Sequence, residues 1–252
     1  MRESGKRLVV LRRALSLLQP GEFRVVARPC PMCGFPLLLR LGDQEHAVRC
    51  PRCRGGVAHL SMASVIADEC PDLPRLDVYE MSSRGALVRF LSRNAQSLTC
   101  SEYFPDTPGG EYRDGVVCQD VQALTFPDAC FDLCTSTDVF EHVADPMTGW
   151  RELLRVLRPG GKLIFTVPLS DQAETVERAV LVDGEIRHLL PPEYHNDHLR
   201  GSGEVLAFRN FGLDIVASLH NAGFENARVN TAFTTQWFGH GRPVIVASRP
   251  SA

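Results

Sequence analysis

The first residues that could do chemistry are four cysteines near the N-terminus. Cys30 and Cys33 form one Cys-Pro-x-Cys sequence, and Cys50 and Cys53 form a second one sixteen residues later. Two such pairs at this spacing are typical of a site in which four thiolates hold one zinc ion. Because four sulfur ligands complete a tetrahedron and leave no position for water or substrate, we expect the zinc to be structural.

The segment between the pairs can bring them together. The stretches FPLLLRL (35–41) and HAVR (46–49) favour two strands of a short hairpin, and the whole arrangement resembles a zinc ribbon. His46 and His59 lie nearby, but four cysteines already fill the tetrahedron, so neither histidine is expected to bind the ion. A redox role for one Cys-x-x-Cys pair is the alternative, and the presence of a second pair argues against it.

From about residue 74 the chain alternates strand-like and helix-like segments. This order predicts a parallel sheet covered by helices on both faces, with a ligand beyond the carboxyl ends of the strands. The class is α/β, a Rossmann-like doubly wound sheet, and the pattern by itself indicates a nucleotide or dinucleotide binder. Strands are expected at 76–81, 97–103, 115–120, 131–137, 161–169, 226–233 and 242–248, and helices at 84–94, 147–157 and 211–224.

A longer motif narrows the function. The stretch LTFPDACFDLCTSTDVFEHVADPMTGWRELLRVLRPGGKLIFTVP (124–168) resembles the class I SAM-dependent methyltransferases, and is most similar to their type 11 group. Its end, LRPGGKLIFTVP, is expected to be a helix end, a Pro-Gly-Gly turn and a buried strand. The resemblance implies a seven-stranded sheet, S-adenosyl-L-methionine (SAM) as cofactor and methyl transfer as activity.

The resemblance also implies a set of cofactor-binding positions. Glu102, at the end of the second strand, corresponds to the acid that accepts both ribose hydroxyls. Asp120 and Val121 correspond to the pair that contacts the adenine amino group and ring. The first loop departs from the usual glycine-rich pattern, because YEMSSRGA keeps only Gly85. The implied cofactor-binding residues are Glu80, Ser82, Ser83, Arg84, Gly85, Glu102, Tyr103, Asp120, Val121, Thr137 and Asp138.

Two histidines are candidates for catalysis. His142 lies in FEHV beside the expected cofactor pocket, where a buried, hydrogen-bonded structural histidine is an equal alternative. His195 lies in the insertion 183–210, an apparent loop that could cover the strand ends as a substrate lid and supply a general base. Incidental surface histidines, or a metal pair formed by His195 and His198, are the alternatives for this segment.

Charge and composition suggest how the chain is organised. Residues 1–60 hold 11 Lys and Arg against 4 Asp and Glu, whereas the whole chain has a formal net charge of −3. The expected organisation is an N-terminal amphipathic helix (1–22), the zinc ribbon (23–60), a linker helix (61–75) and a SAM-dependent methyltransferase domain (76–252) with a substrate-lid insertion at about 170–210. Scattered cysteines outside the two pairs favour a reducing compartment, so we expect a cytoplasmic protein without a membrane span or secretory signal.

The sequence leaves three functions open. The favoured one is a SAM-dependent methyltransferase that acts on a small molecule. The second is an RNA methyltransferase whose basic ribbon contacts phosphates, although no aromatic and basic stacking surface stands out. The third is a non-catalytic, methyltransferase-like scaffold protein, which is supported only by the altered loop around Gly85.

Overall fold

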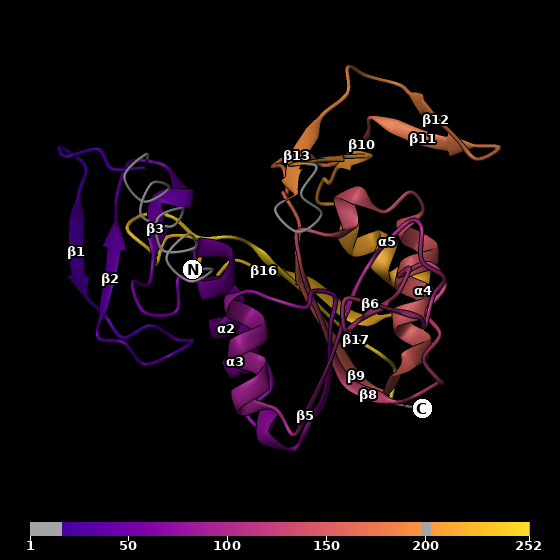
Figure 1. The fold of residues 1–252 in the computed structure, drawn as a ribbon, viewed down its shortest axis with the longest axis horizontal. Helices are drawn as coiled ribbons and strands as arrows, with labels where there is room; N and C mark the ends of the chain where they lie inside the picture. Colours follow the sequence, from indigo (N-terminus) through magenta and orange to yellow (C-terminus); the bar gives the residue numbers. More distant parts are fainter. Residues whose placement is uncertain (1–16, 198–202, 252) are drawn as a thin grey trace.

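The computed structural model describes residues 17–197 and 203–251. It shows a small N-terminal module beside a larger α/β domain (Figure 1). The module contains the antiparallel strands β1 (Arg24–Ala27), β2 (Leu37–Arg40) and β3 (Val48–Arg49), with a short 3-10 helix η1 (Glu45–Ala47) before β3. Leu39 of β2 pairs with Arg49 of β3, which confirms the hairpin expected between the two cysteine pairs.

The larger domain is built on one mixed sheet. Its strand order is β16-β17-β9-β8-β4-β5-β7-β6, and β4, β5, β7, β8 and β9 run parallel. The sheet has eight strands rather than the predicted seven, because Tyr112 and Arg113 form a short edge strand antiparallel to β7. The bounds are β4 (Asp77–Glu80), β5 (Ser97–Glu102), β6 (Tyr112–Arg113), β7 (Val116–Cys118), β8 (Phe131–Thr137), β9 (Leu157–Thr166), β16 (Glu225–Asn230) and β17 (Val244–Ser248).

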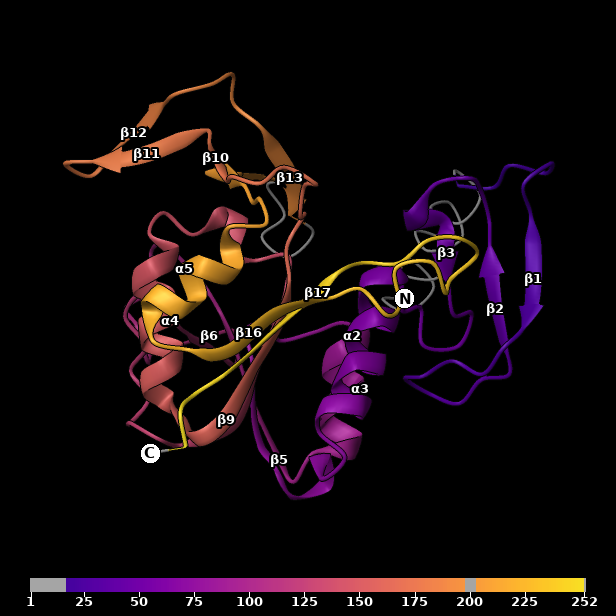
Figure 2. The same cartoon turned by 180° about the vertical axis from the view of Figure 1, so that it is seen from behind.

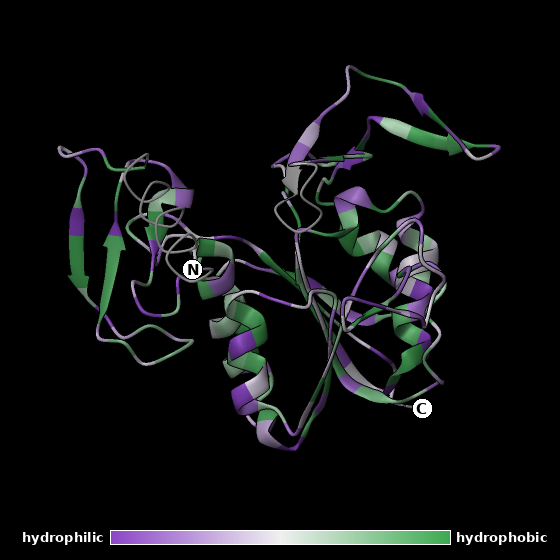
Figure 3. Ribbon diagram, viewed as in Figure 1, coloured by the Kyte–Doolittle hydropathy of each residue, from purple (hydrophilic) through white to green (hydrophobic). Residues whose placement is uncertain are grey.

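In the described part of the chain, four α-helices cover the two faces of this sheet. Helices α2 and α3 lie on one face and α4 and α5 on the other (Figures 1 and 2). In Figure 3 α3 and α4 carry both hydrophobic and hydrophilic residues, as expected for helices that bury one side, whereas residues 60–66 of α2 are all buried. Two separate buried clusters result, one around Leu60 and Leu91 and one around Trp150 and Leu219. The bounds are α2 (Val57–Glu69), α3 (Ala86–Asn94), α4 (Pro146–Val156) and α5 (Ile215–Ala222), with short 3-10 helices η2 (Leu73–Arg75) and η3 (Phe140–His142).

Local chemistry explains where these elements begin and end. The Asp145 side chain accepts a hydrogen bond from the backbone N–H of Thr148, which caps α4. Helix α5 ends at Gly223, which has φ of +106°. The Pro-Gly-Gly sequence that was predicted as a turn instead lies within β9. It forms an irregularity where the pairing of β8 with β9 shifts register, because Gly161 packs against the Arg158 and Asp132 carbonyls too closely for a side chain.

The insertion at 183–210, where it is described, is not the loop that the sequence suggested. Three two-stranded antiparallel pairings form between residues 176 and 210, and His195 lies in a strand because β13 pairs with β14. Figure 1 shows these strands arching over α4 and α5. Their bounds are β10 (Val176–Glu177), β11 (Ala179–Val182), β12 (Glu185–His188), β13 (Tyr194–Asp197), β14 (Gly203–Leu206) and β15 (Arg209–Asn210).

The small module is joined to the larger domain by more than the chain connection. The segment between β16 and β17 extends from the sheet to the module (Figure 2). There Ser61 Oγ accepts hydrogen bonds from Trp237 Nε1 and from the Arg242 backbone N–H, each at 3.2 Å. Arg28 of the module donates to the Gln236 carbonyl at 2.6 Å. The module therefore rests on the loop that precedes the last strand.

Two further expectations concern the ends and the surface. Most of the predicted N-terminal helix, residues 1–16, lies outside the described residues, and residues 17–22 contain turns but no helix, with Pro20 and Gly21 in one of the turns. The helix expected at 61–75 starts earlier, at Val57, and ends at Glu69 before Pro71. Within the described part of the chain, no helix is long and apolar enough to cross a membrane.

Candidate active site

A cavity opens where the strand order of the sheet reverses direction. Strand β4 lies between β5 and β8, and the chain crosses to opposite sides of the sheet at this point, which is where ligands bind in open α/β sheets. The cavity has a volume of about 420 Å³. It is lined by Tyr79, Met81, Ser101, Tyr103, Gln119, Asp120, Val121, Gln122, Val139, His142, Val143, Ala144, Leu181, Ile186, Val205 and Phe208. Residues of the sheet therefore form its floor, and residues of the insertion cover it.

Three of the cofactor-binding residues predicted from the sequence line this cavity: Tyr103, Asp120 and Val121. The Asp120 carboxylate accepts a hydrogen bond from the Gln122 backbone N–H at 2.9 Å, which fixes the turn after β7. Glu80, Ser82, Ser83, Arg84, Gly85, Glu102, Thr137 and Asp138 are not among the lining residues.

Glu80 is buried inside the sheet, with 2% of its surface exposed. The Thr135 hydroxyl donates a hydrogen bond to its Oε2 atom. Burial raises the pKa of Glu80 to about 8, the Thr135 hydroxyl opposes this rise and the charge of Glu102 adds to it. At neutral pH the Glu80 carboxyl is therefore largely protonated, and it fastens β4 to β8 next to the cavity floor.

Glu102 is linked directly to the altered first loop. The backbone N–H and the hydroxyl of Ser83 both donate to Glu102 Oε1, each at 2.8 Å. Both bonds end on the same oxygen, so Oε2 is the atom that a ligand hydroxyl could reach. Gly85 caps α3 with φ of +121° and ψ of −173°, a conformation that is essentially restricted to glycine. The one glycine that this loop retains is thus the one that its backbone requires.

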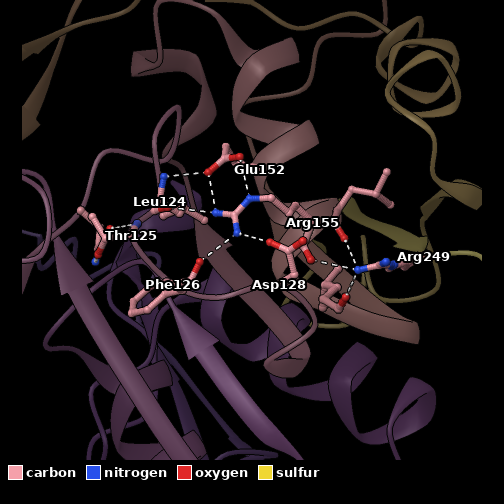
Figure 4. Close-up of polar contacts among 10 residues, drawn as sticks. Leu124, Thr125, Phe126, Asp128, Glu152, Arg155 and Arg249 are labelled. Atoms are coloured by element: carbon pink, nitrogen blue, oxygen red, sulfur yellow. Dashed lines mark hydrogen bonds and ion pairs between the residues drawn. The ribbon is translucent and has the colours of Figure 1, made fainter.

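Arg155 holds the loop that follows Asp120 and Val121 (Figure 4). Its guanidinium donates to the carbonyls of Leu124 and Phe126, each at 2.9 Å, and to Asp128 Oδ1 at 2.7 Å. Glu152 accepts from the same guanidinium and from the Leu124 backbone N–H. Because both side chains project from α4, this network fixes the loop relative to the helix and so fixes one wall of the cavity.

Thr137 is the last residue of β8 and Asp138 follows it, and Asp138 contacts an arginine that also binds the N-terminal module. Asp138 has φ of +52° and accepts a hydrogen bond from Thr166 Oγ1 at 3.0 Å. Arg242 lies 3.3 Å from Asp138 Oδ1 and donates to Glu45 of the module at 3.0 Å through Nε. The Thr137 hydroxyl is buried without a hydrogen-bond partner among the described residues. An arginine thus connects the strand end of the sheet to the small module.

The two candidate catalytic histidines meet at the edge of the cavity. Their rings make an edge-on contact with 5.0 Å between the centroids, and His142 itself lines the cavity. His142 Nδ1 donates to the Leu206 carbonyl at 2.8 Å. Glu141 and Glu193 raise the pKa of His195, Glu141 more strongly, and burial opposes this rise.

Sequence reasoning missed Glu141, which lies between these histidines. Its carboxylate is 1% exposed, and Oε1 lies 3.7 Å from His142 Nε2 and 3.6 Å from His195 Nδ1. Glu141 directly precedes His142 in the sequence, so it could be recognised as a neighbour of a candidate residue. Only the fold shows that its side chain points inward. The lining residues of the insertion, Leu181, Ile186, Val205 and Phe208, were also missed, because nothing in their types indicates which side of a hairpin faces the sheet.

The four paired cysteines converge as predicted. Cys30 Sγ lies 3.7 Å from Cys53 Sγ, and Cys33 Sγ lies 3.6 Å from Cys50 Sγ. All four sulfurs lie within 4.8 Å of one another. Sulfurs bound to zinc at about 2.3 Å in a tetrahedron are separated by about 3.8 Å, so the cluster has the size of a zinc site. A hydrogen bond from the Cys30 thiol lowers the pKa of Cys53.

The second cysteine turn packs against the start of α3. Arg89 of α3 donates to the Cys53 carbonyl at 2.6 Å. A Cβ atom at Gly55 would lie 3.5 Å from the Cβ of Ala86, the first residue of α3. The cysteine module is therefore in contact with the helix that follows the loop from Ser82 to Gly85.

Comparison with known proteins agrees with this geometry. Residues 82–165 match a family model described as a methyltransferase domain. A malonyl-[acyl-carrier protein] O-methyltransferase from Herminiimonas arsenicoxydans is 33% identical over 112 residues, which are 44% of this chain and 36% of that protein. A ubiquinone biosynthesis O-methyltransferase from Coxiella burnetii is 39% identical over 49 residues, 19% of this chain and 21% of that protein. The chain thus matches about a third of the length of the first relative and about a fifth of the length of the second.

A solved structure supports the fold. A chain in the complex of the Haloferax volcanii Trm112 methyltransferase activator superposes with a TM-score of 0.50 and 15% sequence identity, covering 77% of this chain and 90% of that chain. Together, the strand order and this likeness show a Rossmann-like methyltransferase fold, and residues 82–165 of the larger domain match a methyltransferase domain.

Proposed function

We propose that this protein transfers a methyl group from SAM to a small-molecule acceptor bound in the cavity beside His142. The observation that carries the proposal is the position of the cavity, at the switch point of the sheet and with most of its lining residues in the segment that matches a methyltransferase domain. The malonyl-[acyl-carrier protein] and ubiquinone relatives support an acceptor that is not a nucleic acid.

The residues present fit SAM. The wall residues Tyr103 and Val121 offer apolar surface for an adenine ring, and Asp120 offers a carboxylate for its amino group. Glu102 keeps Oε2 for a ribose hydroxyl, because Ser83 binds only Oε1. Arg84, in the loop that the resemblance assigns to the methionine part, supplies a positive charge for the carboxylate of that part. These assignments are proposals that rest on the resemblance and on the geometry of the strand ends.

The protein contributes mainly position to such a reaction. When bound, SAM supplies a methyl group on a positively charged sulfur, which a nucleophile attacks in line. The chain's own part is to hold the acceptor at that methyl group and to exclude water. Leu181, Ile186, Val205 and Phe208 form an apolar cover over the cavity, and His142 is the polar group that reaches it from η3. We propose that His142 and His195 are the catalytic residues that contact the acceptor.

The cysteine cluster is proposed to bind a structural zinc ion. Its four sulfurs complete a tetrahedral site, so the zinc has no open position for the acceptor. The contact of the Cys53 carbonyl with Arg89 links the folding of the module to the position of α3. The module therefore supports the first loop of the cofactor site from outside.

Calorimetric titration with SAM tests the proposal. We expect saturable binding to the wild-type protein and at least tenfold weaker binding to Glu102→Ala, with unchanged affinity in Glu111→Ala, which removes an exposed carboxylate beyond the same strand. The absence of binding at millimolar SAM would reject methyl transfer and favour a scaffold. Retention of the protein on RNA that weakens steeply with salt would replace the small-molecule acceptor with RNA.

A further inference from the structure

A buried carboxylate lies beside the cavity, close to two imidazole rings but beyond hydrogen-bond distance of any donor in the described part of the chain. Glu141 in η3 has 1% of its side chain exposed, and among the described residues neither of its oxygens has a hydrogen-bond partner. Burying an ionised carboxylate without compensation costs several kcal/mol, so such groups are protonated, paired or bound to a cation. The two groups nearest to Glu141 Oε1 are ring nitrogens of His142 and His195.

The tautomer of His142 is fixed by its other ring nitrogen. His142 Nδ1 lies 2.8 Å from the Leu206 carbonyl oxygen, which can only accept, so the ring hydrogen is on Nδ1. In the neutral ring Nε2 then carries a lone pair, and it is Nε2 that lies 3.7 Å from Glu141 Oε1. A lone pair thus faces a carboxylate oxygen.

His195 repeats this arrangement. Its Nε2 lies 3.3 Å from Glu193 Oε1, and the other oxygen of Glu193 lies 3.2 Å from Arg178 Nε. A carboxylate paired with arginine is an acceptor, so in neutral His195 the ring hydrogen is on Nε2 and the lone pair is on Nδ1. That Nδ1 atom lies 3.6 Å from Glu141 Oε1. Both imidazole lone pairs therefore converge on the same buried oxygen.

We propose that Glu141, His142 and His195 form a second metal site, which binds a divalent transition-metal ion. Two imidazoles and one carboxylate are a donor set suited to Zn²⁺, Fe²⁺, Mn²⁺ or Co²⁺. Ligand atoms bound at about 2.1 Å in a tetrahedron are separated by about 3.4 Å, which is close to the 3.6 and 3.7 Å found here. The Leu206 carbonyl and Glu193 are the outer partners that orient the two rings, as metal-binding histidines require.

The position of the site suggests its use. Three protein ligands leave at least one coordination position for an oxygen that the protein does not supply. His142 lines the cavity in which the acceptor is proposed to bind, so the ion would lie beside the acceptor. The site therefore favours an acceptor with a hydroxyl oxygen that binds the ion. This use depends on the proposed methyl transfer, whereas the binding of the ion does not.

Metal titration of the zinc-loaded protein tests the site, with Co²⁺ as the probe. We expect one equivalent of Co²⁺ to bind beyond the zinc of the four cysteines, with visible bands but without thiolate-to-cobalt charge transfer, because the site contains no sulfur. His195→Ala and His142→Ala should each weaken this binding at least tenfold. His188→Ala, which changes an exposed histidine on β12, should leave it unchanged.

Two measurements keep the outcomes separate. Glu141→Gln removes the charge with little change in shape, and thermal unfolding of each variant shows whether the fold is retained. SAM affinity, measured by calorimetry on the same samples, reports on the cofactor site alone. Failure of the wild-type protein to take up a second equivalent, or equal uptake by folded His195→Ala, would overturn the metal site. Loss of SAM binding with retained Co²⁺ uptake would instead overturn the methyltransferase proposal.

Discussion

The hydroxyl of Thr135 on β8 donates a hydrogen bond to the carboxyl of Glu80 on β4, inside the sheet and next to the cavity. This relationship joins the two central strands at the point where ligands bind in such sheets. Because burial raises the pKa of Glu80 to about 8, the side chain is a neutral acid at neutral pH and acts as a fixed part of the sheet.

The first prediction concerns pH and Glu80. Its pKa in the folded protein lies above the ordinary value of 4.5, so its contribution to stability is complete below about pH 4.5 and is lost as the pH rises through 8. The isosteric variant Glu80→Gln cannot ionise. We expect the free energy of unfolding of the variant, relative to wild type, to increase by roughly 4 kcal/mol between pH 4.5 and pH 9. Urea denaturation across this range measures the difference, and a pH-independent difference would refute the buried acid.

The second prediction concerns Gly85. A Cβ atom there would meet no neighbour within 4 Å, so Gly85→Ala acts only through the backbone, whose φ is +121°. We expect the substitution to cost about 1–3 kcal/mol of stability and to weaken SAM binding, because the loop must change shape. Gly21→Ala is the matched control, since Gly21 also has open space but no positive φ. Equal stability of the two variants in chemical denaturation would show that the loop is not constrained at Gly85.

Metal removal gives the third prediction. Stripping zinc with a chelator should unfold the cysteine module, because structural zinc typically contributes about 10–16 kcal/mol to small domains. Since Cys53 contacts Arg89, we also expect faster hydrogen exchange at the start of α3 and weaker SAM binding. Cys33→Ser should release zinc to a chromophoric chelator, whereas Cys130→Ser, outside the cluster, should retain it. A folded, SAM-binding protein without zinc would contradict this role.

The fourth prediction tests the network drawn in Figure 4. Arg155→Ala removes the donor to the Leu124 and Phe126 carbonyls and leaves Glu152 without its cation. We expect a loss of about 2 kcal/mol in the free energy of unfolding and weaker SAM binding through the displaced wall of the cavity. Arg151→Ala, on the exposed side of the same helix, should change neither value by a measurable amount. If both variants behave alike, the network does not position this loop.

Much of the sheet could be predicted from the sequence because its signals are local. The pattern of apolar residues around β8 and α4 predicted a strand and a helix there, and the structure has both. The spacing of the two cysteine pairs predicted the hairpin between them. The edge strand β6 was missed because two exposed residues, Tyr112 and Arg113, carry no periodicity.

The centre of the candidate site could not be predicted in the same way. His142 and His195 were each identified by type, but their edge-on contact depends on how β13 folds back over η3. In the sequence Glu141 cannot be told from an exposed carboxylate on a helix, and only the fold shows that it is buried. Thr137 and Asp138 are the opposite case. Their place in the sequence motif predicted a position at the cofactor pocket, whereas in the structure Asp138 forms an ion pair with Arg242, which also contacts the small module. Long-range packing decides all three cases.

We propose that SAM binds at the strand ends around Glu102 and Val121. A crystal structure of the protein soaked with S-adenosylhomocysteine tests it most directly. We predict density for the adenine against Val121 and for the ribose hydroxyls within hydrogen-bond distance of Glu102 Oε2, with the sulfur directed toward His142. Well-ordered ligand elsewhere, or a crystal that remains without ligand at millimolar concentration, would contradict the account.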